Sequence, residues 1–187
     1  AQGQLYLIHF AGRAPTKVED SIRAIMPDNN YVKIAFPRYR PNSYLIGGSR
    51  LAVDGQPVAT VQTAQPIGAI AVENLQNRKG RIAAKAIARA TTKYLANRAL
   101  RERMRRQSEG AGLLAAVAGT VFAEVSEQAD LRSWQTLPDR VLIGRALVAP
   151  GKHRVQVQLT AGGSAVVATQ ELGEIELQAG QTRFLIV

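Results

Sequence analysis

The sequence predicts an α+β fold, an antiparallel β-sandwich interrupted by an Ala- and Arg-rich helical hairpin. Runs of alternating or β-branched residues, separated by turns about every eight to twelve residues, occupy both ends of the chain. An Ala-rich, strongly basic segment without Pro occupies the middle. The 187 residues suffice for one domain, and a hydrophobic fraction of 46% excludes a disordered chain. We expect a single domain over residues 1–187, with the sandwich at 1–73 and 129–187 and the hairpin at 74–128.

Four strands are expected before the helices, at residues 5–10, 31–36, 51–53 and 58–61. The last two flank Asp54-Gly55, and Asp-Gly between alternating residues is a strong signal for a two-residue hairpin turn. Residues 16–26 remain ambiguous. Thr16 and Glu19 have the spacing of a helical capping box, whereas the run is equally compatible with an extended strand.

The helical segment is expected at residues 78–106, where seven Ala residues support helix formation. Ala83, Ile87, Ala90 and Tyr94 recur at helical spacing and predict the packed face. The pattern fails beyond Asn97, so the second half of this helix is expected to project or fray. A Gly-rich turn at residues 108–112 leads to a second run, 113–127, and the two together predict an antiparallel hairpin. Its expected face consists of Leu114, Val117, Val121 and Val125.

Strands are expected again after the hairpin, at residues 141–148, 153–159, 165–171, 174–178 and 182–187. Turns at Pro150-Gly151, at residues 161–164 and at Gly180 separate them. The run at 153–159 alternates polar and apolar residues, as a strand with one buried face does. The downstream half therefore supplies most of the predicted sandwich.

The positive charge of the chain is concentrated in the helical segment. The chain carries a net charge of +10, and residues 78–106 contain eleven basic residues against the single acid Glu102, which is also a net +10. A stripe at spacings of three and four contains Arg78, Arg81, Lys85, Arg89 and Lys93. Three interpretations remain open: a solvated helix face, a phosphate track for nucleic acid, and a contact for an anionic surface such as lipid headgroups or an acidic protein.

The chain offers little chemistry for catalysis. Cys is absent, which excludes disulfides and thiolate sites, and the two His residues, His9 and His153, lie in separate strand-like runs. We expect them to be ordinary surface histidines of strands. Gly47-Gly48-Ser49 matches neither a phosphate-binding loop nor a nucleophile elbow. The close carboxylate pairs, Glu19-Asp20 and Glu174 with Glu176, are typical of solvated strand edges. We predict no catalytic, metal or cofactor-binding residue, no cofactor and no small-molecule substrate, so the chain is not expected to be an enzyme.

Residues 129–138 contain the single Trp of the chain, Trp134, together with Arg132. The simpler interpretation is that Trp134 fills the core where the helices meet the sheet. The alternative is a binding hot spot, because Trp and Arg are enriched at the centres of interfaces.

The same residues carry a family resemblance. Residues 129–138 contain an Asp-x-Arg-Ser-Trp-x-x-Leu-Pro signature, and this run, followed by the Pro-Gly-Lys-His-Arg-Val run at 150–155, resembles an uncharacterised family of proteobacterial envelope lipoproteins. The Ala-rich run at 85–94 is also similar to that family. The resemblance implies a C-terminal domain that follows a tetratricopeptide-like region. It also implies a periplasmic location, tethered to the outer membrane through an N-terminal region missing here, and a link to cell-wall or outer-membrane machinery. No lipobox Cys or helical repeat precedes residue 5, where the chain opens directly into a strand, as expected for an excised domain.

These observations predict a non-enzymatic periplasmic protein-interaction or assembly domain of an envelope lipoprotein. Its expected partner is an envelope protein or a second copy of the chain. The alternative is a nucleic-acid-binding module that uses the basic helix at 78–106. The residues expected to contact a partner are Arg78, Arg81, Lys85, Arg89, Lys93, Arg132 and Trp134.

Overall fold

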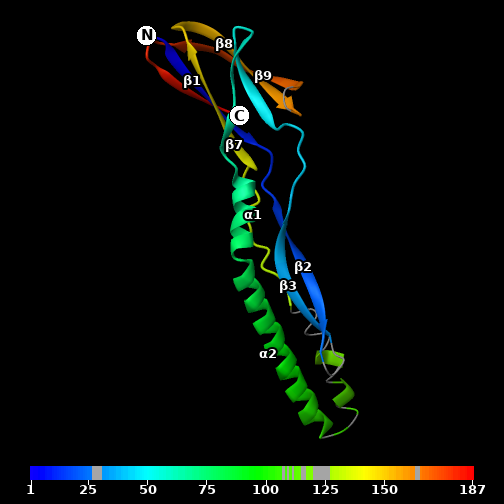
Figure 1. The fold of residues 1–187 in the computed structure, drawn as a ribbon. Coiled ribbons are helices and arrows are strands. Elements are labelled where there is room, and N and C mark those ends of the chain that lie inside the picture. Colours follow the sequence, from blue (N-terminus) through cyan, green and yellow to red (C-terminus); the bar gives the residue numbers. More distant parts are fainter. Residues whose placement is uncertain are drawn as a thin grey trace. The chain divides into compact units, whose positions relative to one another are not determined.

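The computed structural model describes residues 1–26, 31–106, 108, 110, 112–114, 117–119, 127–162 and 165–187. Mostly antiparallel strands precede and follow helices inserted in mid-chain, which confirms the predicted α+β class (Figure 1). The chain divides into two compact units, described separately below. The first contains Ala1–Thr16, Pro41–Val72 and Trp134–Val187, and the second contains Lys17–Arg40 and Glu73–Ser133. That residues 1–187 form a single domain stays a prediction. No helix in the described ranges has the length and apolar character needed to cross a membrane.

The first sheet of the first unit has the strand order β10-β1-β7-β6. Its strands are β1 (Gly3–Ala11), β6 (Gln62–Gln65), β7 (Arg140–Val148) and β10 (Thr182–Ile186). β7 pairs antiparallel with β1 and β6, whereas β10 runs parallel to β1, with Leu5 opposite Arg183. This parallel pair is an exception to the predicted all-antiparallel arrangement. A turn at Gly180, whose φ is +75° and whose N–H donates to the carbonyl of Gln2, brings the last strand alongside the first.

The second sheet has the order β5-β4-β8-β9, and all of its pairs are antiparallel. Its strands are β4 (Gly48–Val53), β5 (Gln56–Thr60), β8 (Gly151–Ala161) and β9 (Ala165–Leu177). The predicted hairpin at Asp54-Gly55 is confirmed. Both turn residues have positive φ, +51° for Asp54 and +81° for Gly55, as the favoured two-residue hairpin turn requires.

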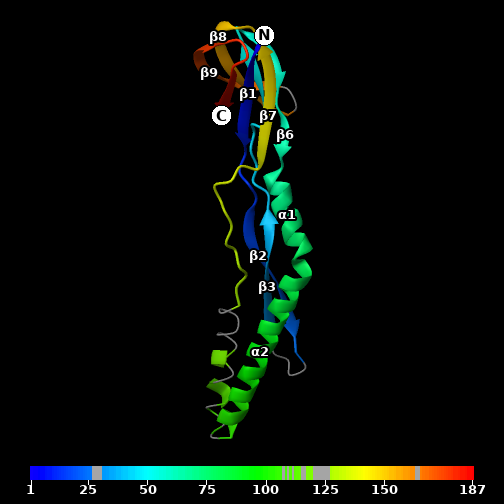
Figure 2. The ribbon, with the colours of Figure 1, turned by 90° about the vertical axis from the view of Figure 1, so that its left-hand side faces the viewer.

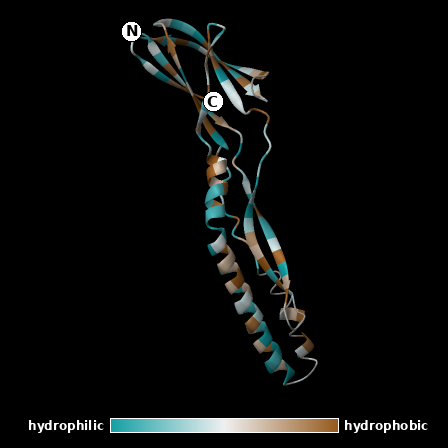
Figure 3. Cartoon of the chain, in the orientation of Figure 1, coloured by the Kyte–Doolittle hydropathy of each residue, from teal (hydrophilic) through white to brown (hydrophobic). Residues whose placement is uncertain are grey.

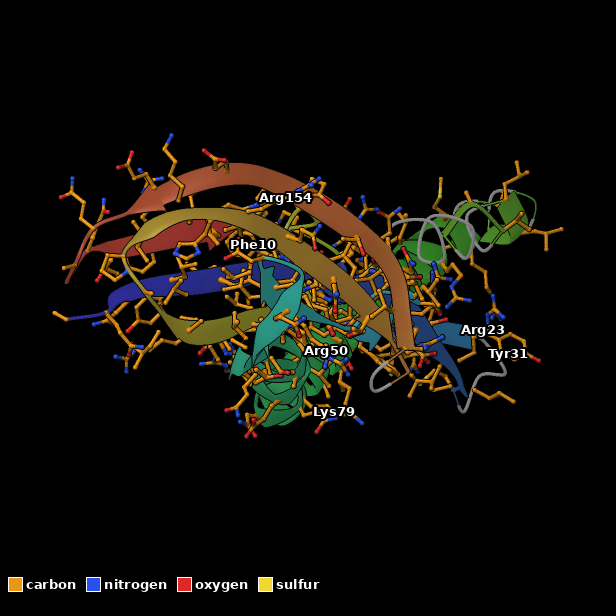
Figure 4. All side chains as sticks on the ribbon, turned by 90° about the horizontal axis from the view of Figure 1, so that it is seen from above. Phe10, Arg23, Tyr31, Arg50, Lys79 and Arg154 are labelled. Carbon is orange, nitrogen blue, oxygen red and sulfur yellow. The ribbon has the colours of Figure 1, made fainter. Side chains whose placement is uncertain are left out.

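β9 is one continuous strand, although the sequence predicted two shorter ones at residues 165–171 and 174–178. Gly173 has a φ of +88° and pairs with Val155, while Glu171 pairs with Gln156, so the register shifts by one residue between them. A single extra residue of this kind is a β-bulge, which bends a strand without ending it. The bulge explains why a turn-like Gly interrupts the pattern of a continuous strand, and Figure 4 shows β8 and β9 as strongly curved ribbons.

One apolar cluster joins the two sheets of the first unit. The alternation of β1 places Leu5 and Leu7 inside, where both are fully buried, while Tyr6 and Ile8 remain half-buried on the other face. The cluster also contains Leu51, Val53, Ala146, Val148, Val155, Val157, Ile175 and Leu177. Each large apolar side chain buried here contributes about 1.5–3 kcal/mol, which makes this cluster the main source of stability in the unit.

The second unit contains a two-stranded hairpin, β2 (Thr16–Ile25) with β3 (Tyr31–Arg40), and helix α2 (Lys79–Arg105). The ambiguity at residues 16–26 is therefore resolved in favour of a strand. β3 packs against α2 (Figure 2). Ala86 and Ala90 are the buried residues of α2, and their small side chains allow a close approach.

The helical insertion begins earlier than predicted, because α1 spans Ile67–Asn77 directly after Pro66. Proline favours the start of a helix, and its carbonyl accepts the N–H of Ile70 at 3.0 Å. Only Arg78 separates α1 from α2. α2 then continues through Asn97 to Arg105 without interruption. Of the two alternatives for its second half, projection and fraying, fraying is therefore wrong. The side-chain amide of Asn97 donates to the carbonyl of Gly119 at 3.0 Å and ties the helix to the returning chain.

The chain returns antiparallel to α2, as predicted. Gly112 lies beside Arg105, Gly119 beside Asn97 and Glu127 beside Lys93, in reverse order along the helix. Residues 112–114 and 117–119 are helical, whereas Val121 and Val125 of the predicted face lie outside the described residues. Leu114 is 74% exposed and Val117 is 59% exposed. At its two described residues, the predicted helical face is therefore exposed to solvent.

Candidate interaction surface around helix α2

The predicted basic stripe divides into two parts. Arg78, Arg81 and Lys85 are exposed, and we call them the basic trio. The side chains of Arg89 and Lys93 are 54% and 29% exposed, and both form ion pairs. The cause is helical geometry, because each four-residue step rotates a side chain about 40° around the axis. By Lys93 the stripe has moved from the solvent side onto the packed side of α2.

Glu127 is the partner of both ion pairs, a role that the sequence pattern did not predict. Its carboxylate is 2% exposed and accepts hydrogen bonds from Lys93 Nζ at 2.9 Å and from Arg89 Nη2 at 3.2 Å. A buried charge is tolerated only when it is paired and hydrogen-bonded. The sequence did contain a clue to this role. Glu127 ends the apolar run at 113–127, and the predicted hairpin places that run opposite a strongly basic helix.

The segment after Glu127 is held by the β2–β3 hairpin. The N–H of Ala129 donates to Glu19 Oε2 at 2.8 Å, and the other oxygen of Glu19 lies 2.8 Å from Lys33 Nζ. These two hydrogen bonds, first that from Lys33 and then that from Ala129, hold the pKa of Glu19 below its ordinary value. Lys17 Nζ donates to the carbonyl of Arg132 at 3.0 Å. The returning chain is therefore anchored to strand and helix by charge-assisted hydrogen bonds.

Arg132 is exposed, but its guanidinium is fixed in position. Its Nε and Nη2 donate to the two carboxylate oxygens of Asp130 at 2.9 and 3.0 Å, and its backbone N–H donates to Asp130 Oδ1 at 3.2 Å. The Arg132 hydrogen bonds lower the pKa of Asp130 to about 2, so the pair stays charged at every physiological pH. An exposed pair of this kind stabilises the fold little, yet it holds Arg132 ready for a contact.

Trp134 is 73% exposed, so the prediction that it fills the core is wrong. Its indole N–H donates to Thr136 Oγ1 at 2.7 Å. The chain just beyond it is held by main-chain hydrogen bonds instead, from Ala14 N–H to the carbonyl of Leu137 and from Asp139 N–H to the carbonyl of Ala11. Those bonds fix the start of β7 without an aromatic plug. The alternative, that Trp134 is a binding hot spot, stays a prediction.

The face of α2 that was predicted to be packed is divided between two sides of the helix. Ala90 is buried and Tyr94 is half-buried, whereas Ile87 is 51% exposed. The solvent side carries a stripe of four apolar residues and one Thr at spacings of three and four residues, and we call it the outer stripe. It consists of Ala84, Ile87, Ala88, Thr91 and Leu95, all exposed. Figure 3 shows hydrophilic and hydrophobic residues alternating along this helix.

The two His residues lie in different surroundings. His9 is buried, so the prediction that it lies at the surface is wrong, whereas His153 is a partly exposed residue of β8. His9 is 6% exposed, and its Nδ1 lies 3.1 Å from Ser49 Oγ. Burial, and then the charge of Arg140, hold the pKa of His9 below its ordinary value. The described residues show no carboxylate hydrogen-bonded to this imidazole, and Ser49 is 1% exposed, so the pair has neither an orienting acid nor access for a substrate.

His153 lies at the end of the second sheet, near the Asp54-Gly55 turn. Its Nδ1 lies 2.7 Å from Asp54 Oδ2 and its Nε2 lies 2.8 Å from the carbonyl of Ala149. Both ring nitrogens therefore face acceptors, an arrangement that suits the doubly protonated ring. These hydrogen bonds, that to Asp54 first, raise the pKa of His153 above its ordinary value.

The described ranges contain no group of three His, Asp or Glu residues placed to hold a metal ion. Three of the four carboxylates singled out in the sequence have partners, and the fourth, Glu176, is exposed. Glu19 pairs with Lys33, Asp20 with Arg38, and Glu174 with Lys152. The last two pairs are largely exposed, as expected for charges at strand edges.

Comparisons with known proteins return no matching family model, no matching curated protein and no matching solved structure.

Proposed function

We propose that this chain is a non-enzymatic protein-interaction domain whose contact surface is the solvent side of α2. The observation that carries the proposal is the coexistence on one helix of the basic trio and the outer stripe. Apolar side chains bordered by cations are typical of protein interfaces, where an apolar centre is surrounded by a polar rim. We also propose that the two four-stranded sheets of the first unit act as a sandwich-type scaffold.

The partner that best fits this surface is an acidic protein that presents an amphipathic helix. The outer stripe has the spacing i, i+3, i+4, i+7 and i+11 that helices use to pack against each other. Carboxylates flanking such a helix would pair with the basic trio. In keeping with the resemblance of residues 129–138 to envelope lipoproteins, we place this partner in the bacterial periplasm. It is either an envelope protein of the cell-wall or outer-membrane machinery or a second copy of the chain.

Arg132 and Trp134 belong to the proposal as separate contacts. The side chain of Arg132 is 91% exposed with its guanidinium held by Asp130, and Trp134 is 73% exposed. A fixed Arg and a large exposed aromatic lose little conformational entropy on binding, which is why such residues dominate interface energies.

Two observations weigh against a phosphate track. Arg89 and Lys93, two of the five cations of the predicted stripe, are committed to Glu127. The one aromatic residue of α2, Tyr94, is half-buried on the packed side, where it offers no platform for stacking bases. Binding of nucleic acid is therefore treated as a contrary outcome of the experiment below.

The test is a pull-down from bacterial envelope extract with three forms of the chain. The basic-trio variant carries Arg78→Glu, Arg81→Glu and Lys85→Glu. The control variant carries Lys152→Glu, Arg154→Glu and Arg183→Glu, three exposed cations of the first unit, and so has the same net charge. A protein recovered by wild type and by the control variant, but not by the basic-trio variant, supports the proposal. Recovery of nuclease-sensitive nucleic acid would refute it.

A further inference from the structure

The second unit contains a cavity of about 290 Å³ bounded by the end of α1, by α2, by the β2–β3 hairpin and by the segment that follows Glu127. This volume is near the lower limit of about 300 Å³ found for small-molecule sites. The cavity shares Lys85 with the basic trio, but none of its other lining residues belongs to the trio or to the outer stripe, so ligand binding here can be tested separately.

The walls of the cavity carry an excess of positive charge. Lys17, Lys85 and Arg89 line it, and Asp130 is the one acidic residue among its lining residues. Both oxygens of Asp130 are engaged by Arg132 in the bidentate pair described above. The carboxylate is thus neutralised from outside the cavity and cannot balance the three cations.

Lys85 is the cation that remains available. Lys17 donates to the carbonyl of Arg132, and Arg89 donates to Glu127. Within the described part of the chain, Lys85 has no hydrogen bond or ion pair. An ammonium group with three donors therefore lies at the cavity wall, one helical turn before Arg89, whose guanidinium has five N–H donors.

The remaining walls are apolar. Leu75 and Ile82 contribute aliphatic side chains, and β3 contributes Ala35 and Pro37. A site for free inorganic phosphate would be lined by donors on all sides, whereas organic ligands are held by apolar walls with a few polar groups that fix their orientation. The lining of this cavity resembles a site for an organic ligand, with apolar walls and a few polar groups.

We propose that this cavity binds a small organic anion with one carboxylate or phosphate head and a short aliphatic body packed against Leu75 and Ile82. The head is held by Lys85, with a further contact from the N–H groups of Arg89 other than the one that it donates to Glu127. The head group would complete the hydrogen-bonding capacity of Lys85. A carboxylate and a phosphate monoester share this chemistry, and the probes below separate them.

The experiment is calorimetric titration of the full chain with hexanoate and with hexyl phosphate at low salt. Inorganic phosphate and hexanol serve as half-ligands that lack the body and the head, respectively. At least one anionic probe is expected to bind at millimolar or tighter affinity, and both half-ligands at least about tenfold more weakly. Whichever of hexanoate and hexyl phosphate binds more tightly identifies the head group.

Two variants make the result specific. Lys85→Gln is expected to weaken the better probe by about tenfold or more, because it removes a charge-assisted contact. Arg98→Gln removes an equal charge from an exposed position of α2 that does not line the cavity, and it is expected to leave binding unchanged. The proposal is overturned if neither anionic probe binds, if Lys85→Gln binds as well as wild type, or if inorganic phosphate binds as tightly as hexyl phosphate.

Discussion

The carboxylate of Glu127 lies 2.9 Å from the ammonium of Lys93 and is almost entirely withdrawn from solvent. This ion pair, with Arg89 as its second donor, fastens the returning chain to α2. Part of the positive charge of the helical segment, that of Arg89 and Lys93, is therefore used to hold the fold together. The part that we propose for contact with a partner is the basic trio, whose three side chains are exposed.

Removing Lys93 is expected to destabilise the second unit more than removing Arg89. Lys93→Met leaves a buried carboxylate with one partially exposed partner, and we expect it to cost about 2–3 kcal/mol. Arg89→Met should cost less than about 1 kcal/mol, because that side chain is 54% exposed and the closer Lys93 contact persists. Urea unfolding followed by far-UV circular dichroism measures both. Equal losses would contradict the dominant role of Lys93.

Replacing Trp134 is expected to leave stability almost unchanged. Trp134→Ala should shift the free energy of unfolding by no more than about 0.5 kcal/mol, because the ring is 73% exposed. A Trp that filled the core would instead cost about 3–5 kcal/mol. Since the chain has a single Trp, collisional quenching of its fluorescence by iodide reports this side chain alone and should be efficient in the folded protein.

The pair formed by His153 and Asp54 is expected to make stability depend on pH. Because the pKa of His153 is raised in the folded protein, its protonated imidazole stabilises the fold. This stabilisation is complete below pH 6.5, the ordinary pKa of the group, and is lost as pH rises through the raised pKa. The pKa of Asp54 is lowered, so its ionised carboxylate stabilises the fold above pH 3.8, the ordinary pKa of the group, and this stabilisation is lost as pH falls through the lowered pKa. The pair therefore stabilises most between these two ordinary values.

The corresponding measurement compares wild type with His153→Gln in urea unfolding at about pH 5 and about pH 9. The difference in the free energy of unfolding between the two proteins should be larger at the lower pH. A difference that is independent of pH would mean that the imidazole is not protonated in the folded state.

Two Gly→Ala substitutions should have opposite effects. Gly12 has a φ of +68°, and a Cβ there would lie 2.3 Å from the ring of Tyr44, whose hydroxyl donates to Asp139 at 2.5 Å. Gly12→Ala is expected to cost about 2–3 kcal/mol through backbone strain and displacement of that ring. Gly80 is helical with open space around it, so Gly80→Ala should stabilise by about 0.5–1 kcal/mol. Thermal unfolding of both variants tests the two predictions. A stabilising effect of Gly12→Ala would show that Tyr44 does not lie against Gly12.

Local patterns predicted much of the fold. The Asp54-Gly55 turn is specified by its own two residues, and the long α2 by its Ala content. The parallel pairing of β10 with β1 depends on contacts between the two ends of the chain, which no local pattern encodes. The prediction of two strands in place of β9 was wrong for the same reason. Whether Gly173 forms a turn or a bulge depends on the partner strand, which the local sequence does not specify.

The candidate surface was predictable in part. The spacing of the basic stripe identified its five residues, but which of them face solvent depends on where the chain returns, and Glu127 decides that for Arg89 and Lys93. The exposure of Trp134 depends on main-chain hydrogen bonds between distant segments. Residue type alone favoured the core for this side chain, since aromatic residues bury large apolar areas.

Site-specific photo-crosslinking can show whether the solvent side of α2 contacts a protein. A photoreactive residue in place of Ala84, within the outer stripe, is activated in bacterial envelope extract. We expect a discrete protein adduct that forms with wild type and with the control variant and disappears in the basic-trio variant. An adduct that persists in the basic-trio variant, a nucleic-acid adduct, or the absence of any adduct would contradict this expectation.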